Sequence, residues 1–356
     1  MRGLLKNLGY LEIKTPIIFN TELWKKSGHF DNYKDKMYFV GKEAKLGIKP
    51  MNCPESMLVF NEYQRTYRDL PLRFSDFGIL HRQEQAGEIN GLFRAREFII
   101  DDAHIYCRVE QIASEIKNLI KLIKKVYQKF GFNEYKVELS TRPKKFIGSR
   151  KDWDKSEEAL KKILKEEKIS FKENKGEGAF YGPKIDFHIK DSLGRSWQLG
   201  TIQLDFASAK RLSVNFINEQ GKKEHPVLVH RAILGSLERF IAILLEHYAG
   251  ALPIWLSPVQ VKVLPIAERH LAYAKEIRNK IYEIGIRVEV DKRNETLPKK
   301  IRDGEIEKIP YLLVIGDKEI KNKKVAVRRR EKGDLGEMGL EQFTEDVIIK
   351  IWENGK

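Results

Sequence analysis

The chain has 356 residues, enough for two domains with cores of their own. Its 66 lysines and arginines exceed its 51 acidic residues by 15. A surplus of this size indicates a polyanionic partner, with nucleic acid as the first candidate. A basic protein without such a partner explains the charge about equally well. No run approaches the roughly 18 apolar residues of a transmembrane helix, the N-terminus is too mixed for a signal peptide, and two cysteines without a CxxC pair do not indicate a disulfide framework. We therefore expect a cytoplasmic protein that does not enter a membrane.

The first part of the chain predicts a series of short elements. Residues 1–20 are predicted as a helix end followed by a strand that Pro16 interrupts, and residues 21–36 as a helix start and a polar loop with His29. A strand hairpin is predicted over 37–49. It is followed by a loop with Cys53 that leads into a helix of about three turns.

A hairpin with a long polar loop is predicted for residues 74–107, and the chain is organised around it. Arg82 and Glu84 are two residues apart, and so are Asp102 and His104, which places each pair on one face of its strand. A solvated antiparallel face is the common alternative. We favour a binding floor, because other segments converge on this hairpin.

Lysine and glutamate dominate residues 144–175 with helical spacing. The run is either an RNA-facing arm or a solvated helix that covers an insertion, and we favour the second. The other elements of this half are predicted as a helix over 109–130, a strand over 135–141, two strands over 180–206 joined by a turn at Leu193-Gly194, and a strand over 226–230 that runs into a helix over 231–250.

Two glutamines lie on the strand pattern around residue 200. Gln198 and Gln203 differ by an odd number of residues, so on a regular strand they would face opposite sides. Gly200 lies between them and could form a bulge that turns both to one face. An unbroken ladder through 196–204 would remove one of them from a shared site.

The two prolines of 252–258 predict a linker, so we expect one domain over 1–251 and another over 258–356. The second domain is predicted as a small α/β unit with strands over 259–265, 286–290, 310–315 and 324–329 and helices over 267–284, 296–307 and 341–353.

Cys53, His104 and His230 are the candidates for metal ligands, because protein zinc sites use thiolate and imidazole. Their wide separation is a weak signal, and a lone histidine is more often structural. Cys107 is the rival thiol, but its odd spacing from His104 turns it to the opposite face of a regular strand. Zinc suits this ligand set better than copper.

Arg82 and Arg239 are the candidates for phosphate contacts, because an arginine fork grips a phosphate through two hydrogen bonds. We place Gly235 one turn before Arg239 on the same helix, where the missing side chain would let a strand approach. The chain has no Walker loop and no GxGxxG, so a nucleotide would bind to sheet-borne side chains. A surface ion pair is the better explanation for either arginine taken alone.

Three segments resemble the signature motifs of class II aminoacyl-tRNA synthetases: LEIKTP the end of motif 1, FGILHRQEQ with FRAREF motif 2, and LGSLERF motif 3. The segments SGHFDNYKD, KPMNCP and DDAHIYC narrow the resemblance to the threonyl-tRNA synthetase family, and it covers nearly the whole chain. It implies an α+β fold: an antiparallel sheet flanked by helices, followed by a small C-terminal α/β anticodon-binding domain with a mixed sheet.

The same resemblance implies roles for individual residues. Cys53, His104 and His230 would bind zinc, Arg82 the α-phosphate of ATP, and Arg239 its outer phosphate. Glu84 would bind the adenine amino group, Phe98 would stack on adenine, and Arg94 would complete motif 2. Gln198 and Gln203 would line the nucleotide and substrate pocket, and Asp102 would accept from the threonine hydroxyl beside Tyr181, Lys184 and Met51. His29 would assist acyl transfer, and the anticodon readers would be Asn294, Glu319 and Arg328.

The implied activity is the ATP- and magnesium-dependent ligation of L-threonine to tRNA(Thr), with zinc used to recognise threonine. Serine differs by one methyl group, worth only ~1–3 kcal/mol in a pocket, so it should also be activated. Ile100 replaces the usual glutamine, and we expect a protein that lacks the N-terminal editing region of the family. We expect a homodimer through motif 1, uncorrected seryl-tRNA and a separate editing protein. The alternatives are a seryl- or prolyl-type enzyme, a catalytically impaired tRNA-binding module, or a synthetase fragment.

Overall fold

The computed structural model describes residues 1–355, with side chains through residue 351. The chain divides into two compact units, Met1–Leu244 and Leu245–Lys356. None of the helices in the described part of the chain combines the length and the apolar character needed to cross a bilayer.

The first unit is built on an eight-stranded sheet whose inner strands are all antiparallel, with parallel pairs only at its two edges. Its strands, in spatial order, are β1 (Tyr10–Glu12), β6 (Leu72–His81), β7 (Glu97–Cys107), β14 (Val227–Ser236), β11 (Ser196–Asp205), β10 (Lys184–Lys190), β8 (Lys136–Ser140) and β9 (Lys172–Asn174). The predicted central hairpin is present, because every residue of β6 pairs with a residue of β7.

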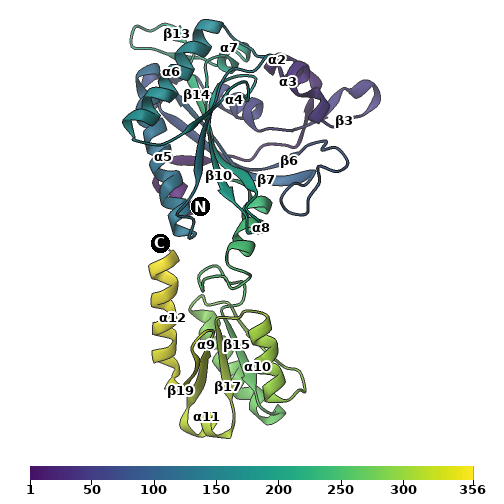
Figure 1. Ribbon diagram of the computed structural model, residues 1–356, viewed down its shortest axis with the longest axis vertical. Coiled ribbons are helices and arrows are strands. Elements are labelled where there is room, and N and C mark those ends of the chain that lie inside the picture. The colour runs from purple at the N-terminus through teal and green to yellow at the C-terminus, as the bar shows by residue number, and fades with distance from the viewer. Residues whose placement is uncertain (356) are drawn as a thin grey trace. The chain divides into compact units, whose positions relative to one another are not determined.

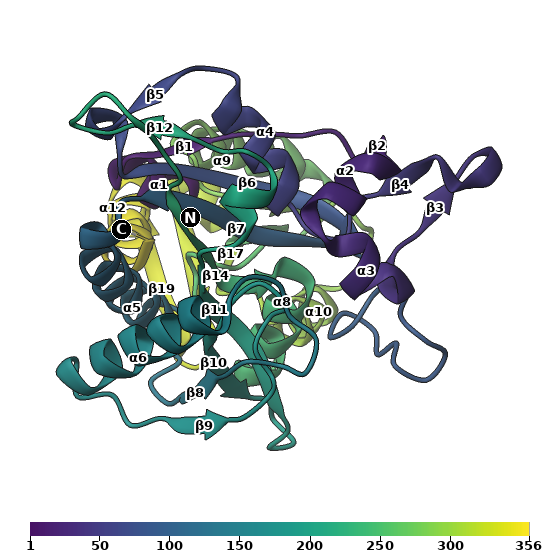
Figure 2. The ribbon, with the colours of Figure 1, turned by 90° about the horizontal axis from the view of Figure 1, so that it is seen from above.

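Helices flank this sheet, as the sequence predicted. They are α1 (Arg2–Asn7), α2 (Thr21–Ser27), α3 (His29–Tyr33), α4 (Cys53–Asn61), α5 (Ile112–Lys129), α6 (Arg150–Glu166), α7 (Ser208–Arg211) and α8 (Leu237–His247). Figures 1 and 2 both place α5 and α6 on one side of the unit and α2 and α3 on the other. The long helix α5 buries a stripe of isoleucine, leucine and valine at helical spacing and packs on β11 and β14.

Two small sheets complete the first unit. One joins β2 (Ile18–Asn20), β4 (Leu46–Ile48) and β3 (Phe39–Val40), and the other joins β13 (Lys223–Glu224), β12 (Phe216–Ile217) and β5 (Arg65–Thr66). The β3–β4 pair is the hairpin predicted for 37–49.

Two sequence-based expectations on the elements are wrong. The strand expected over 226–230 continues as β14 to Ser236, because the buried apolar run that follows His230 suits a buried strand as well as a helix. His29 begins helix α3 instead of lying in a loop, because Gly28, at φ +86°, ends α2 in the left-handed conformation and lets α3 start at once.

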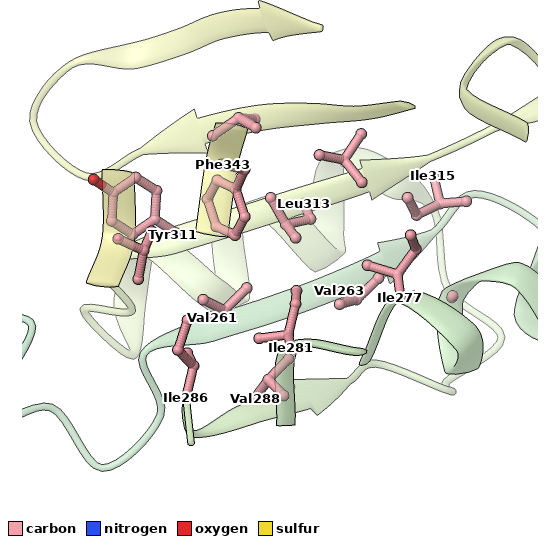
Figure 3. Packing of buried hydrophobic residues seen from close by; sticks show 14 residues of the cluster. Val261, Val263, Ile277, Ile281, Ile286, Val288, Tyr311, Leu313, Ile315 and Phe343 are labelled. Atoms are coloured by element: carbon pink, nitrogen blue, oxygen red, sulfur yellow. The ribbon is translucent and has the colours of Figure 1, made fainter. Parts of the chain in front are cut away.

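The second unit has a mixed five-stranded sheet, in the order β16 (Val288–Val290), β15 (Val261–Pro265), β17 (Tyr311–Ile315), β18 (Lys324–Arg329) and β19 (Gly333–Gly339). Its helices are α9 (Leu271–Glu283), α10 (Leu297–Ile306), α11 (Asp317–Asn322) and α12 (Leu340–Gly355). Figure 3 shows its separate core, where Val261, Leu313 and Phe343 meet side chains of α9. The sequence-based prediction omitted α11 and β19, since the first is short and the second carries three glycines.

Candidate active site on the antiparallel sheet

Four candidate side chains form one row across the large sheet. Lys184 on β10 lies opposite Gln203 on β11, Gln203 lies opposite His230 on β14, and His230 lies opposite His104 on β7. Directly opposed residues of an antiparallel pair project to the same face. Residues from four separate segments therefore lie on one face of the sheet.

Cys53, the first residue of α4, joins this row at its histidines. The ligand atoms of Cys53, His104 and His230 all lie within 4.8 Å of one another, and all three residues are buried. Nε2 of His104 and Nδ1 of His230 have no hydrogen-bond partner among the described residues. A thiol and two unpartnered imidazole nitrogens fit a zinc ion that keeps a further coordination position open.

Asp205 orients one of these ligands, and sequence reasoning missed it. Its carboxylate lies 3.1 Å from Nε2 of His230, and it also accepts from the backbone N–H groups of Ala207 and Ser208. A proton on Nε2 leaves the lone pair of His230 on Nδ1, toward the cluster. The only signal in the sequence was an acidic residue at the end of a strand.

Cys107 lies away from the cluster, as its spacing predicted. It is the last residue of β7 and is buried, whereas the described group of potential metal ligands contains Cys53. Burial raises the pKa of both thiols, so a thiolate at Cys53 needs a cation beside it.

A cavity of about 370 Å³ opens on the same face, next to the row. Burial and the neighbouring charges of Arg94 and Arg82 lower the pKa of Arg239 to about 10. Three converging guanidinium groups make this cavity a site for a polyanion. Its lining includes Arg82, Glu84, Arg94, Phe98, Ile100, Gln198, Gln203 and Arg239.

The location of Arg82 and Glu84 corrects the prediction. The strand β6 ends at His81, so both residues lie beyond it instead of sharing a face of the strand. They still line the cavity. The guanidinium of Arg82 lies 5.0 Å from the centre of the Phe98 ring, and Glu84 is bound at 2.9 Å by Lys36.

The bulge predicted at Gly200 is present. The β10–β11 register shifts between Asp186 and His188, so β11 carries one extra residue between Gln198 and Thr201. Both predicted glutamines line the cavity. A side chain at position 200 would collide with the Tyr127 hydroxyl, which accepts the Gly200 N–H at 2.8 Å.

Gly235 does not lie on the helix of Arg239, as was expected, but near the end of β14, at φ +71°. The expected close approach exists, because a Cβ there would meet the carbonyl oxygen of Leu199 at 2.8 Å. Arg239, on α8, is fixed by its hydrogen bonds to the carbonyl oxygens of Phe93 and Gln198.

The remaining substrate candidates surround the metal candidates. Asp102 accepts from Asn52, burial raises the pKa of Asp102, and Ile100 lines the cavity two residues away. Tyr181 stacks on His230 at 4.7 Å and donates to Gln203. Met51 packs beside Tyr181.

His29 is buried between Trp24 and Phe180. Burial lowers its pKa to about 3, so the imidazole is neutral. Ser27 lies 2.9 Å from its Nδ1 and donates its own proton to a carbonyl oxygen, which places the imidazole proton on Nδ1. Nε2 then carries a free lone pair and has no partner in the described structure.

The three anticodon candidates all belong to the second unit. Asn294 is exposed in the loop before α10, Glu319 caps α11 through the N–H of Gly316, and Arg328 lies on β18 beside Glu305 and Asp334. No hydrogen bond or ion pair joins any two of the three candidates in the described part of the chain.

Comparisons with known proteins agree with this architecture. Residues 38–248 match the family "tRNA synthetase class II core domain (G, H, P, S and T)", and residues 260–349 match "Anticodon binding domain". A prolyl-tRNA synthetase from Cryptosporidium parvum is similar in fold, with a TM-score of 0.72, at 19% identity over 99% of this chain and 67% of that one.

Two relatives are much closer. The threonine--tRNA ligase of Acetivibrio thermocellus is 54% identical over 352 residues, which are 98% of this chain and 55% of the relative. The RNA binding domain of threonyl-tRNA synthetase from Cryptosporidium parvum is 41% identical with a TM-score of 0.93, over 98% of this chain and 88% of that one. This chain thus spans about half the length of the curated relatives it matches. It belongs to the class II aminoacyl-tRNA synthetases and, within them, to the threonyl-tRNA synthetase family.

Proposed function

We propose that this chain activates L-threonine with ATP and transfers the threonyl group to the 3′ end of tRNA(Thr). One observation carries the proposal. The ligand atoms of Cys53, His104 and His230 gather within 4.8 Å on the sheet face that also bears the arginine-lined cavity. An amino acid at the cluster would therefore have its carboxylate directed toward a nucleotide in the cavity.

The amino-acid half of the site would recognise both polar groups of threonine. A zinc ion held by Cys53, His104 and His230 would supply an electrophilic centre open to the substrate amine and hydroxyl. Asp102, two residues from His104 on β7, would accept the hydroxyl proton. Valine offers no hydroxyl and leaves these groups unsatisfied, which is the strongest form of rejection.

The nucleotide half would bind ATP through charge and stacking. Arg82 and Arg239 would bind the α- and outer phosphates, with magnesium and Arg94 sharing the negative charge that builds up when the carboxylate attacks the α-phosphorus. Phe98 offers its ring to adenine. Glu84 can bind the adenine amino group once its bond to Lys36 is exchanged.

In the transfer step, His29 would accept a proton. Its imidazole is neutral, so Nε2 has a lone pair that can accept a proton, and no described residue forms a hydrogen bond with this nitrogen. Lys184 and Gln203 would position the activated amino acid from the same row.

The partners in the proposal are tRNA(Thr), a second copy of the chain and an editing protein. Asn294, Glu319 and Arg328 would read the anticodon. The motif 1 segment at β1 would form a homodimer, and its support is an exposed apolar surface in which Leu11 is 55% accessible. Sedimentation equilibrium would test the dimer.

The decisive test measures zinc content together with threonine-dependent pyrophosphate exchange. We expect about one zinc per chain, exchange with threonine and serine, and almost none with valine. A zinc-loaded protein that exchanges pyrophosphate with none of these amino acids would overturn the proposal.

A further inference from the structure

A buried carboxylate in β10 lies on the same face of the sheet as the row, without belonging to the metal cluster. Asp186 is 2% exposed, and its side chain accepts four hydrogen bonds. Oδ1 accepts from Gln198 Nε2 at 2.7 Å and from Thr201 Oγ1 at 2.8 Å, and Oδ2 accepts from Lys184 Nζ at 2.7 Å and from Ser140 Oγ at 3.0 Å.

Three of these four donors belong to the site. Gln198 and Thr201 line the cavity, and Lys184 stands in the row that leads to the metal candidates. The fourth donor, Ser140, comes from β8, on the other side of β10. A carboxylate offers about four lone-pair directions, so all of them are used. Asp186 therefore has no capacity left to act as a base or a metal ligand itself.

An acceptor-only group fixes the direction of every hydrogen bond that it receives. Gln198 must present its NH₂ to Asp186, which leaves its Oε1 as an acceptor for a ligand in the cavity. Thr201 must give its only proton to Asp186, so its oxygen accepts from Gln203 Nε2 at 3.2 Å. The amide of Gln203 is thereby oriented, and its Oε1 accepts from Tyr181, which stacks on His230.

We propose that Asp186 is a positioning residue that sets the polarity of both halves of the site. Through Gln198 it orients the nucleotide pocket, through Thr201, Gln203 and Tyr181 it orients the wall of the metal cluster, and it neutralises Lys184. This inference rests on the proposed function and adds to it a residue that touches neither substrate.

The test compares Asp186→Asn with Ser140→Ala in the full chain. An asparagine would turn an NH₂ group toward two donors, so we expect the kcat/KM of threonine-dependent pyrophosphate exchange to fall at least about tenfold. Ser140→Ala removes only the donor away from the cavity, and we expect its kcat/KM to change less than about twofold. An equal loss in both variants would overturn the proposal.

A double-mutant cycle separates positioning from a general loss of stability. If Asp186 acts through Gln198, adding Asp186→Asn to Gln198→Ala should raise KM for ATP by far less than it does in the parental protein. Effects that simply multiply would contradict the inference. The parental protein must first show threonine-dependent exchange, and failure there would reject the proposed function instead.

Thr201→Val provides a second test of the proposal if Asp186→Asn does not fold. It breaks the link between Asp186 and Gln203 and leaves the bond from Gln198 to Asp186 in place, so KM for threonine should rise about tenfold and by a clearly larger factor than KM for ATP. An equal rise in both constants, or none in either, would overturn the proposal.

Discussion

The protein has two buried thiols, and the proposed metal site uses only one of them. Cys53 starts α4 next to His104 and His230, whereas Cys107 ends β7 away from them. We expect Cys53→Ser to lower the zinc content from about one ion per chain to nearly none, because a hydroxyl is a poor zinc ligand. Metal analysis of the purified proteins checks this.

Cys107→Ser is the matched control, since this thiol is equally buried. The control should keep its zinc and lose only about 1–2 kcal/mol of unfolding free energy. Zinc retained by Cys53→Ser, or lost by Cys107→Ser, would place the ion elsewhere.

The buried imidazole of His29 predicts a pH-dependent stability. Burial lowers its pKa to about 3, and the unfolded chain binds this proton near pH 6.5. The contribution of neutral His29 is therefore present above pH 6.5 and is lost as the pH falls. Between pH 7 and pH 5 it should decrease by about 2 kcal/mol.

The measurement compares His29→Gln with the parental protein in urea titrations at both pH values. The difference in unfolding free energy between the two proteins should shrink by about 2 kcal/mol on acidification. A difference that is the same at pH 7 and pH 5 would contradict this, because it would show that His29 has the same pKa in the folded protein as in the unfolded chain.

At the scale of single residues, the sequence identified residues that belong to a recognisable motif. It did not identify the residues that hydrogen-bond to them and orient them. Cys53, His104 and His230 were recognisable from their flanking residues. Asp205 and Asp186 were not, because each acts through contacts that exist only after strands pair. An acidic residue on a strand looks the same whether it faces solvent or binds four donors.

At the scale of elements, alternation and turn residues predicted the central hairpin and most boundaries to within a few residues. They failed where a segment is apolar on both faces, as in the second half of β14. Gly235 was recognised as a position of close approach but was assigned to the helix, since nothing in the pattern shows where β14 ends and α8 begins.

Gly235→Ala tests what the junction of β14 with α8 requires. Both the positive φ and the approach of the Leu199 carbonyl oxygen to 2.8 Å oppose a methyl group there. We expect a loss of more than about 3 kcal/mol of unfolding free energy, together with weaker ATP binding, because Arg239 lies four residues later in the first turn of α8.

Gly194→Ala separates the two causes. Gly194 has a similar φ, +78°, but open space where its Cβ would lie, so its replacement should cost only about 1 kcal/mol. Equal losses in both variants, measured by urea titration, would show that backbone conformation alone explains the junction.

At the scale of the whole molecule, the chain combines two hydrophobic cores with a net positive charge. Each unit has buried hydrophobic residues of its own, and the units divide between Leu244 and Leu245, whereas the change of pattern in the sequence predicted a linker over 252–258. The surplus of 15 positive charges is a property of the whole chain, and in the proposed function the three arginines that line the cavity would bind the nucleotide. The remaining surface charge is thus available to a larger polyanion.

This charge balance predicts that binding of tRNA weakens steeply with salt while threonine activation does not. Each RNA phosphate neutralised by a lysine or arginine releases counterions, so the logarithm of the association constant should fall linearly with the logarithm of salt concentration, by about 0.7–0.9 per contact. Filter binding between 50 and 300 mM potassium chloride measures the slope. Pyrophosphate exchange without tRNA is the control, since in the proposed function it depends on the half-buried arginines of the cavity and not on the outer surface. We expect several contacts and hence a steep slope for binding, with exchange changing little. A slope near zero would mean that the excess charge takes no part in holding RNA, and that recognition rests on base contacts alone.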